Sequence, residues 1–268
     1  MGTETPPEPF EDAVPRVRSL VRDAPALLVC LDFDGTLAPI VDDPAVAAPT
    51  AANEAAVASL TARPRVTTAV VSGRALADVR ERIDGPAIYA GNHGLELERN
   101  GSIAVHPIAS RRARCLGEIC TLLELTVGTV PNCRIENKRL TGTVHLRSVP
   151  ASARPIVREY TRAVVDRFGG ERLDVSTGKR ILEIGPAIPW GKGNAVELIE
   201  SELSSEAVSI YIGDDVTDES AFDAVEPDGV GIRVGGDEPS AASVRVESPT
   251  AVSSVLEWFD STAVDLLE

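Results

Sequence analysis

The sequence predicts an α/β fold, in which a doubly wound parallel sheet is interrupted by a smaller inserted module. Apolar runs of strand length alternate with segments of helical spacing in the first hundred residues, and this alternation returns after residue 186. Between them, residues 107–186 follow the order helix, two strands, helix, two strands. With 268 residues, 43% of them hydrophobic and 25% charged, the chain is long enough for such an arrangement.

The expected domains are a short N-terminal tail with a helix (1–25), a core (26–106 with 187–268) and the inserted α+β module (107–186). The core begins with a buried strand over 27–31, followed by a helix over 53–62 and a second strand that ends in Ser-Gly. A helix over 75–83, a further strand, a glycine-punctuated loop and a hairpin about Asn100-Gly101 complete its first part.

In the inserted module, strands are expected around Thr141-Gly142 and around Gly178-Lys179, each pair preceded by a helix. That order predicts a small antiparallel sheet with helices on one face. The core then resumes with elements that read helix, strand, helix, strand and helix, at 191–203, 207–215, 217–225, 229–235 and 249–260.

Charge and hydropathy exclude several classes of protein. A net charge of −15 argues against binding to nucleic acid, which needs a dense basic surface. No run approaches the roughly 18 apolar residues of a membrane span, and the N-terminus has no apolar signal region. We therefore expect a cytoplasmic location with no membrane partner, and four reduced cysteines.

Polar clusters follow three of the predicted strands. Asp32 and Asp34 lie two positions apart, so in an extended chain their carboxylates would point the same way. The carboxyl ends of parallel strands share one edge of the sheet, which adds the acids of the segment "GDDVTD" (Asp214, Asp215, Asp218). Carboxylates this close repel one another unless a cation lies between them. Because all the ligands are oxygen atoms, Mg²⁺ is the expected cation.

Lysine is rare in this chain, and each lysine is therefore informative. Among 26 basic residues, the only lysines are Lys138, Lys179 and Lys192. A compact ammonium and a planar guanidinium are not equivalent donors, so a retained lysine indicates a place where the arginine fork does not fit.

The motifs together resemble a known family. "DFDGTLAPI" is similar to the first motif of the haloacid-dehalogenase (HAD) superfamily, and Ser72, Lys192 and "GDDVTD" resemble its other three in the right order. The segments "YAGNHGLE", "IENK", "GKRILEI" and "GDDVTDESAF" are similar to trehalose-6-phosphate phosphatases over roughly 26–260. The resemblance implies an HAD-like core with a cap.

The resemblance also implies roles at the core site. Asp32 would be the nucleophile, and Asp34 the general acid and then the base. Asp32, the backbone carbonyl of Asp34, and Asp214 would hold Mg²⁺, and Asp215 and Asp218 would complete the coordination or hold its ligands in place. The phosphoryl group would be bound by Ser72, Gly73, Arg74 and Lys192.

Sugar recognition is expected from two further groups of residues. Glu136 with Lys138, and Lys179 with Glu183, would bind sugar hydroxyls from the cap, and a loop would add Asn92, His93 and Glu96. His145 and Arg147 lie in a family-like segment, where a structural role for His145 is an equal alternative. The resemblance thus implies hydrolysis of trehalose 6-phosphate, with any trehalose-phosphate synthase a separate protein.

Two alternatives stay open from the residues. One is a phosphatase for another sugar or glycoside phosphate, such as sucrose phosphate or mannosyl-3-phosphoglycerate, with the same core and a different cap. The other is a non-catalytic regulatory module that binds trehalose phosphate. Such a module would be expected to lack a catalytic acid or the phosphate-binding lysine, and both are present in this chain.

Overall fold

The structure is a computed structural model that describes residues 6–178, 180–203 and 207–267. The chain forms two compact units, which are residues 1–103 with 190–268 (the core unit) and residues 104–189 (the inserted unit). The sequence placed the inserted module at 107–186, three residues inside these boundaries at each end. Among the described residues, no helix has the length and apolar character that crossing a bilayer requires.

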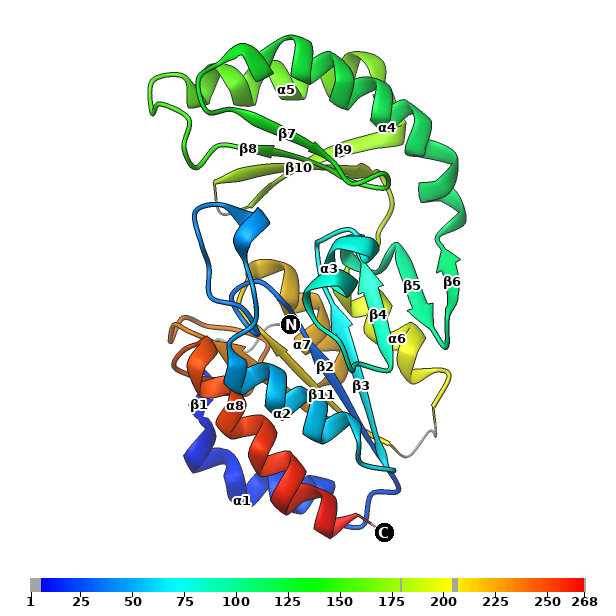
Figure 1. Cartoon of the computed structure of the whole chain (residues 1–268), viewed down its shortest axis with the longest axis vertical. Coiled ribbons are helices and arrows are strands. Elements are labelled where there is room, and N and C mark those ends of the chain that lie inside the picture. Colours follow the sequence, from blue (N-terminus) through cyan, green and yellow to red (C-terminus); the bar gives the residue numbers. More distant parts are fainter. Residues whose placement is uncertain (1–5, 179, 204–206, 268) are drawn as a thin grey trace. The chain divides into compact units, whose positions relative to one another are not determined.

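The core unit is built on a nine-stranded sheet in the order β1-β13-β12-β11-β2-β3-β4-β5-β6 (Figure 1). Neighbours from β1 to β4 are parallel, and β5 pairs with β4 in the antiparallel sense. The strands are β1 (Glu8–Pro9), β2 (Leu27–Leu31), β3 (Val66–Val71), β4 (Ile88–Gly91), β5 (Glu96–Arg99), β6 (Ser102–Val105), β11 (Val208–Gly213), β12 (Val230–Val234) and β13 (Val244–Val246).

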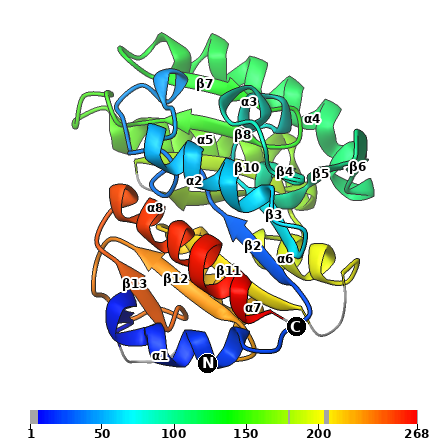
Figure 2. The same ribbon diagram turned by 60° about the horizontal axis from the view of Figure 1, so that its bottom comes forward.

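Helices cover both faces of this sheet (Figure 2). α1, α2, α3 and α8 pack on one face, while α6 and α7 pack on the other. The helices are α1 (Phe10–Val21), α2 (Ala51–Thr61), α3 (Leu76–Arg82), α6 (Lys192–Glu200), α7 (Glu219–Val225) and α8 (Pro249–Trp258).

Burial on both faces explains the continuous apolar sequence of the central strands. In β2, Leu27, Val29 and Leu31 point into the core beneath α1, α2 and α8, and Leu28 and Cys30 point into the core beneath α6 and α7. The strand order reverses at β2, with β3 on one side and β11 on the other. Ligands bind at such a switch point, beyond the carboxyl ends of the strands.

The inserted unit is an antiparallel sheet in the order β7-β8-β10-β9, with α4 and α5 packed on one face. Its apolar core includes Leu116 of α4, Val144 of β8, Val157 of α5 and Leu182 of β10. The elements are α4 (Pro107–Leu125), β7 (Arg134–Asn137), β8 (Gly142–His145), α5 (Arg154–Phe168), β9 (Leu173–Gly178) and β10 (Ile181–Pro186). The structure therefore confirms the predicted fold class, a parallel α/β core with a separate antiparallel α+β cap.

Two strands were not expected from the sequence. β1 and β13 have only two and three residues, and they pair with each other at the edge of the sheet. The helix α1 that follows β1 buries Phe10, Val17 and Val21 against the core. The N-terminal segment is thus part of the core unit from residue 6 onward. All four cysteines are free thiols.

Candidate active site

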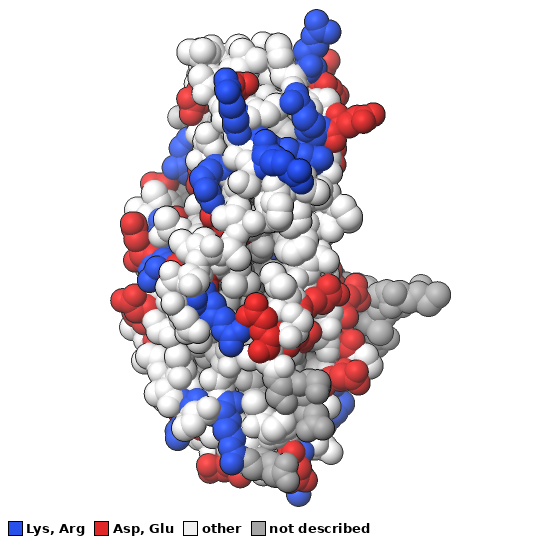
Figure 3. Space-filling model, turned by 90° about the vertical axis from the view of Figure 1, so that its right-hand side faces the viewer, with Lys and Arg blue, Asp and Glu red and all other residues white. Residues whose placement is uncertain are grey.

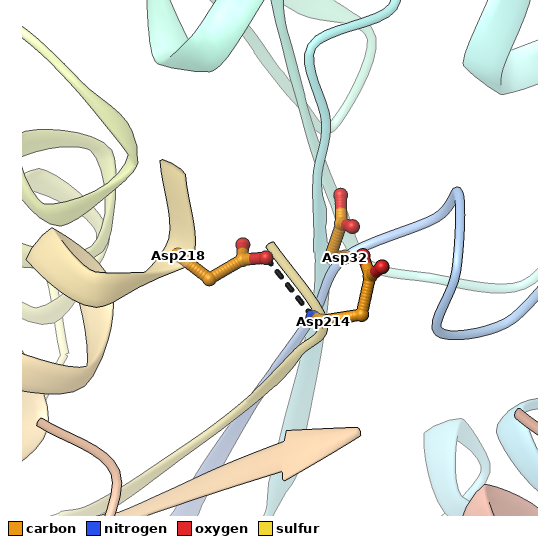
Figure 4. Close-up of side chains that lie close together, drawn as sticks. All are labelled: Asp32, Asp214 and Asp218. Atoms are coloured by element: carbon orange, nitrogen blue, oxygen red, sulfur yellow. Dashed lines mark hydrogen bonds between the residues drawn. The ribbon is translucent and has the colours of Figure 1, made fainter. Parts of the chain in front are cut away.

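Three acidic side chains gather at the carboxyl ends of β2 and β11. Asp32 directly follows β2, Asp214 follows β11, and Asp218 lies at the end of the turn that leads into α7. One carboxylate oxygen from each lies within 4.8 Å of the others, and Figure 4 shows the Asp32 and Asp214 carboxylates side by side. Asp32 and Asp218 are buried, with 4% and 0% of their surface exposed.

Glycines make this close approach possible. Gly35 has φ +87°, a conformation that favours glycine, and a Cβ there would lie 2.2 Å from Cγ of Asp214. A Cβ at Gly213 would lie 2.4 Å from Cγ of Asp218. The glycines of "DGT" and "GDD" therefore allow the two loops to pack against the acids.

A buried network holds Lys192 between two of the acids. Its Nζ lies 2.7 Å from Asp32 Oδ1 and 2.7 Å from Asp218 Oδ1. Asp218 Oδ1 also accepts from the Tyr211 hydroxyl at 2.6 Å, and Oδ2 accepts the backbone amides of Asp214 and Asp215. Burial alone would lower the pKa of Lys192, but the carboxylates of Asp218 and Asp32 raise it, so the ammonium stays charged.

The cluster has an excess of negative charge. Asp32, Asp214 and Asp218 face one ammonium, that of Lys192. Burial raises the pKa of Asp32, Lys192 opposes this, and the Asp218 and Asp214 carboxylates raise it further. Asp32, Asp214 and Asp218 together offer a cluster of carboxylate oxygens. Such oxygen donors suit a divalent ion such as Mg²⁺.

We expect Mg²⁺ to stabilise the folded chain through Asp214. At ~100 times the dissociation constant, the added stability is ~2.7 kcal/mol, which raises the unfolding temperature by roughly 5 to 10 °C. Asp214→Asn should lose most of this rise, measured by thermal unfolding with and without Mg²⁺. Asp223→Asn, an exposed acid on α7, is the matched control and should keep it. An equal rise in the Asp214 variant and the wild type would contradict the assignment.

The structure separates Asp34 from the carboxylate cluster. The sequence led us to expect the Asp32 and Asp34 carboxylates together, whereas Asp34 accepts two hydrogen bonds of 2.7 Å from Arg74. Arg74 also donates to Asp78 and to the carbonyl of Pro44, and its guanidinium lies 5.2 Å from the Phe33 ring centroid. The chain turns after Asp32, because the amides of residues 36–38 all donate to the carbonyl of Phe33. The chain is therefore no longer extended after β2 ends at Leu31, and the rule that residues two apart point the same way does not apply to Asp32 and Asp34.

The loop after β3 presents Ser72 and Gly73. Ser72 is 1% exposed, and its Oγ accepts the Arg74 amide at 3.2 Å. A Cβ at Gly73 would lie 2.7 Å from the His93 ring, so a side chain there would have to displace that ring. The Arg74 side chain is turned toward Asp34, a contact that the sequence reasoning missed, since only the Arg74–Asp78 spacing of four was visible locally.

Asn92, His93 and Glu96 brace this loop. Glu96 Oε1 accepts from the Asn92 side chain at 2.7 Å and from the Leu76 amide at the start of α3 at 2.8 Å. The Asn92 and His93 amides donate to the carbonyls of Arg74 and Ser72, and both residues have positive φ. These contacts are within the protein, and a role toward a sugar stays a prediction.

The polar face of the cap sheet forms a second group. Glu136, Thr143 and Glu183 are aligned across β7, β8 and β10. Glu183 accepts from Lys138 Nζ at 2.7 Å and from the Thr143 hydroxyl at 2.8 Å.

Glu136 lies 2.8 Å from Nε2 of His145, and this hydrogen bond is the largest contribution that lowers the pKa of Glu136. The strands therefore bring Lys138 to Glu183 and Glu136 to His145, and the sugar-binding role expected of these residues stays a prediction. Lys179 lies outside the described residues, and the backbone carbonyl of Arg147 accepts a hydrogen bond from Arg154.

The pattern that defines the trehalose-phosphatase family matches residues 30–250. Trehalose-phosphate phosphatase of Mycobacterium marinum is 41% identical over 241 residues, which cover 85% of this chain and 60% of that protein. The chain thus spans less than two thirds of the length of that relative.

Solved structures with a similar fold also include trehalose-6-phosphate phosphatases and related proteins. A trehalose-6-phosphate phosphatase related protein superimposes with a TM-score of 0.78 at 27% identity, covering 89% of this chain and 99% of the other. The C-terminal domain of the Candida albicans trehalose-6-phosphate phosphatase gives a TM-score of 0.80, with 96% and 99% coverage; at 20% identity it supports the fold alone.

The parallel sheet, the acids at its carboxyl edge and the separate cap sheet define an HAD-like protein. Within that class, the chain belongs to the trehalose-phosphatase family.

Proposed function

We propose that this chain is a Mg²⁺-dependent phosphatase that hydrolyses trehalose 6-phosphate to trehalose and phosphate, the last step of trehalose biosynthesis. The observation that carries the proposal is the buried contact of Asp32 with Lys192 beside Asp214, at the switch point of the sheet. This arrangement supplies a carboxylate nucleophile, a fixed cation and two oxygen ligands in a chain of the trehalose-phosphatase family.

In the proposed reaction, an oxygen of Asp32 attacks phosphorus while the bond from phosphorus to the sugar oxygen breaks. Asp34 gives its proton to that leaving oxygen, and trehalose departs from a phosphoaspartyl group on Asp32. Asp34 then takes a proton from a water molecule, whose oxygen attacks the phosphorus. The bond from phosphorus to the Asp32 oxygen breaks, which releases phosphate and restores the Asp32 carboxylate. Mg²⁺ held by Asp32, the carbonyl of Asp34 and Asp214 would offset the charge of the phosphoryl oxygens.

The surrounding residues have matching roles in this proposal. Lys192, Ser72 and the amides of Gly73 and Arg74 bind the phosphoryl oxygens. Asp218 is a positioning residue, because it fixes Lys192 and the amides of the "GDD" loop. Asp34 accepts two bonds from Arg74, so its work on the leaving oxygen requires it to turn from that guanidinium.

The charged face of the cap carries sugar recognition in this proposal. Glu136, Lys138 and Glu183 present carboxylate and ammonium groups on one face of the sheet, which suits the hydroxyls of a neutral disaccharide. Lys179 is proposed to act with them from the sequence alone. Asn92, His93 and Glu96 keep their proposed place near the sugar or the leaving oxygen.

Glu136→Gln and Glu183→Gln test whether the cap recognises the sugar. Each should lower kcat/KM for trehalose 6-phosphate by roughly tenfold to a hundredfold, the effect of losing a charge-assisted hydrogen bond of ~1.5–3 kcal/mol. Hydrolysis of a small aryl phosphate should change less than threefold. Glu159→Gln, an exposed acid on α5, is the control and should alter neither substrate. Equal losses on both substrates would show that these acids support the fold or the chemistry rather than the sugar.

Two other functions differ in measurable ways. A phosphatase for sucrose phosphate or mannosyl-3-phosphoglycerate would use the same core residues but prefer that substrate. A regulatory module would bind trehalose 6-phosphate without releasing phosphate. The intact set of Asp32, Asp34 and Lys192 favours turnover. We further propose a cytoplasmic enzyme whose substrate is supplied by a trehalose-phosphate synthase and that binds neither nucleic acid nor membranes.

A further inference from the structure

The inserted unit carries charge of the opposite sign to the rest of the chain. Residues 104–189 contain 14 Lys and Arg against 8 Asp and Glu, a formal charge of +6, whereas the other residues contain 12 against 33, which gives −21. Figure 3 shows blue side chains gathered on the surface of the inserted unit, at the top of that view.

Most of this positive charge on α4 and α5 is not compensated by ion pairs. Within the described ranges, Arg114 with Glu118 is the only ion pair made by an arginine of these two helices, with a distance of 3.0 Å. The core unit differs, since arginines such as Arg74, Arg82 and Arg233 are paired with acids. Unpaired guanidinium groups on one surface attract an anion.

Three arginines, among them Arg114 with its partner Glu118, line a cavity of about 420 Å³ in the inserted unit. Arg111 and Arg114 come from α4, and Arg172 comes from the turn after α5. Residues three and four apart share one face of a helix. Arg111 and Arg114 therefore lie on the same face of α4 as the other lining residues of that helix, which are Cys115, Glu118, Ile119 and Leu122.

Part of the cavity lining is apolar. Ile119, Leu122 and Phe168 line it, and Phe168 is 53% exposed. Arg172 is fixed by hydrogen bonds to the carbonyls of Gly169 and Phe168, at 3.1 and 2.9 Å. Cys115 Sγ donates to the carbonyl of Phe168 at 3.6 Å, which ties α4 to the end of α5.

From this geometry we propose a second ligand site, which takes a phosphate monoester with an apolar body. Guanidinium groups match phosphate oxygens with paired hydrogen bonds. Three arginines and Glu118 give the lining a net charge of +2, which complements the nearly dianionic phosphate of a monoester at pH 7. The apolar part of the lining takes the rest of the ligand, and the volume is in the range of small-molecule sites, ~300–1,000 Å³. The site is separate from the carboxylate cluster and does not depend on the proposed activity.

Protection of Cys115 from alkylation tests the site in the full chain. The probe is hexylphosphonate, whose carbon–phosphorus bond a phosphatase does not hydrolyse. Alkylation by iodoacetamide is followed peptide by peptide, with the part-buried Cys133, which does not line the cavity, as the internal reference. Saturating hexylphosphonate should slow the alkylation of Cys115 about tenfold or more and leave Cys133 unchanged. Hexanol has the apolar chain without the anion, and methylphosphonate has the anion without the chain. Each should give little protection at the same concentration.

Two variants locate the anion. Arg111→Gln should weaken protection by hexylphosphonate roughly tenfold, because one charge-assisted contact is lost. Arg158→Gln removes the same charge from α5 ten residues before Phe168, ~15 Å along the helix, and should have no effect. Protection by hexanol alone, equal loss in both variants, or no protection of Cys115 would each overturn the proposal.

Discussion

Asp32→Asn is expected to lower phosphate release from trehalose 6-phosphate by at least ~1,000-fold, because the amide cannot form the phosphoaspartyl group. The folded state should survive. Asparagine has nearly the same shape, and burial already raises the pKa of Asp32, so the removed charge is one that its surroundings oppose. Thermal unfolding should therefore shift by only a few degrees.

Mass spectrometry of the acid-quenched enzyme gives the direct measurement. Wild-type chain mixed with substrate and Mg²⁺ should carry a phosphoryl mass on the peptide that contains Asp32, and the Asn variant should not. Asp34→Asn is the informative companion, since slowed leaving-group departure and slowed hydrolysis predict a loss of ~10²–10⁴-fold with the nucleophile intact. Near-normal turnover by folded Asp32→Asn chain would show that another group attacks phosphorus.

The second large effect is expected for Lys192→Arg. The Lys192 side chain is buried, with 3% of its surface exposed, and its Nζ atom lies 2.7 Å from both Asp32 and Asp218. A guanidinium keeps the charge but is too broad to occupy this point without displacing a carboxylate. We expect turnover to fall by roughly 10²–10³-fold, the cost of losing one preorganised donor at the developing charge.

Stability and turnover must be measured on the same preparation of Lys192→Arg. Overpacking typically costs ~1–3 kcal/mol, which lowers the unfolding temperature by several degrees and leaves the chain folded at 25 °C. The conservative exchange Arg99→Lys at an exposed pair on β5 is the control, and it should change neither quantity. Turnover close to wild type would show that charge alone is sufficient at position 192.

Local patterns predicted most of the core because the central strands are rich in apolar and β-branched residues. Leu27–Leu31 and Val208–Gly213 are buried on both faces, and that burial is visible in their composition. β1 and β13 could not be found this way. They have only two and three residues, and β1 pairs with β13, which lies more than 200 residues later in the sequence.

In the site, too, some residues could be placed from the sequence and some contacts could not. Asp32, Asp214 and Lys192 follow strands or begin a helix, so the topology of a doubly wound sheet brings them together. The Arg74–Asp34 contact depends on the turn after Phe33, and the Lys138–Glu183 and Glu136–His145 pairs depend on strand register across the cap sheet. No local spacing encodes such contacts between segments that are far apart in the sequence.

Phosphate release across a panel of sugar phosphates tests the central claim most directly. The panel contains trehalose 6-phosphate, sucrose 6-phosphate, glucose 6-phosphate and mannosyl-3-phosphoglycerate, each measured with Mg²⁺ and with a chelator. The account predicts the highest kcat/KM for trehalose 6-phosphate by at least ~100-fold, the discrimination expected from two or more cap hydrogen bonds, and loss of activity with the chelator. Equal or better turnover of another member, or binding of trehalose 6-phosphate without phosphate release, would contradict it.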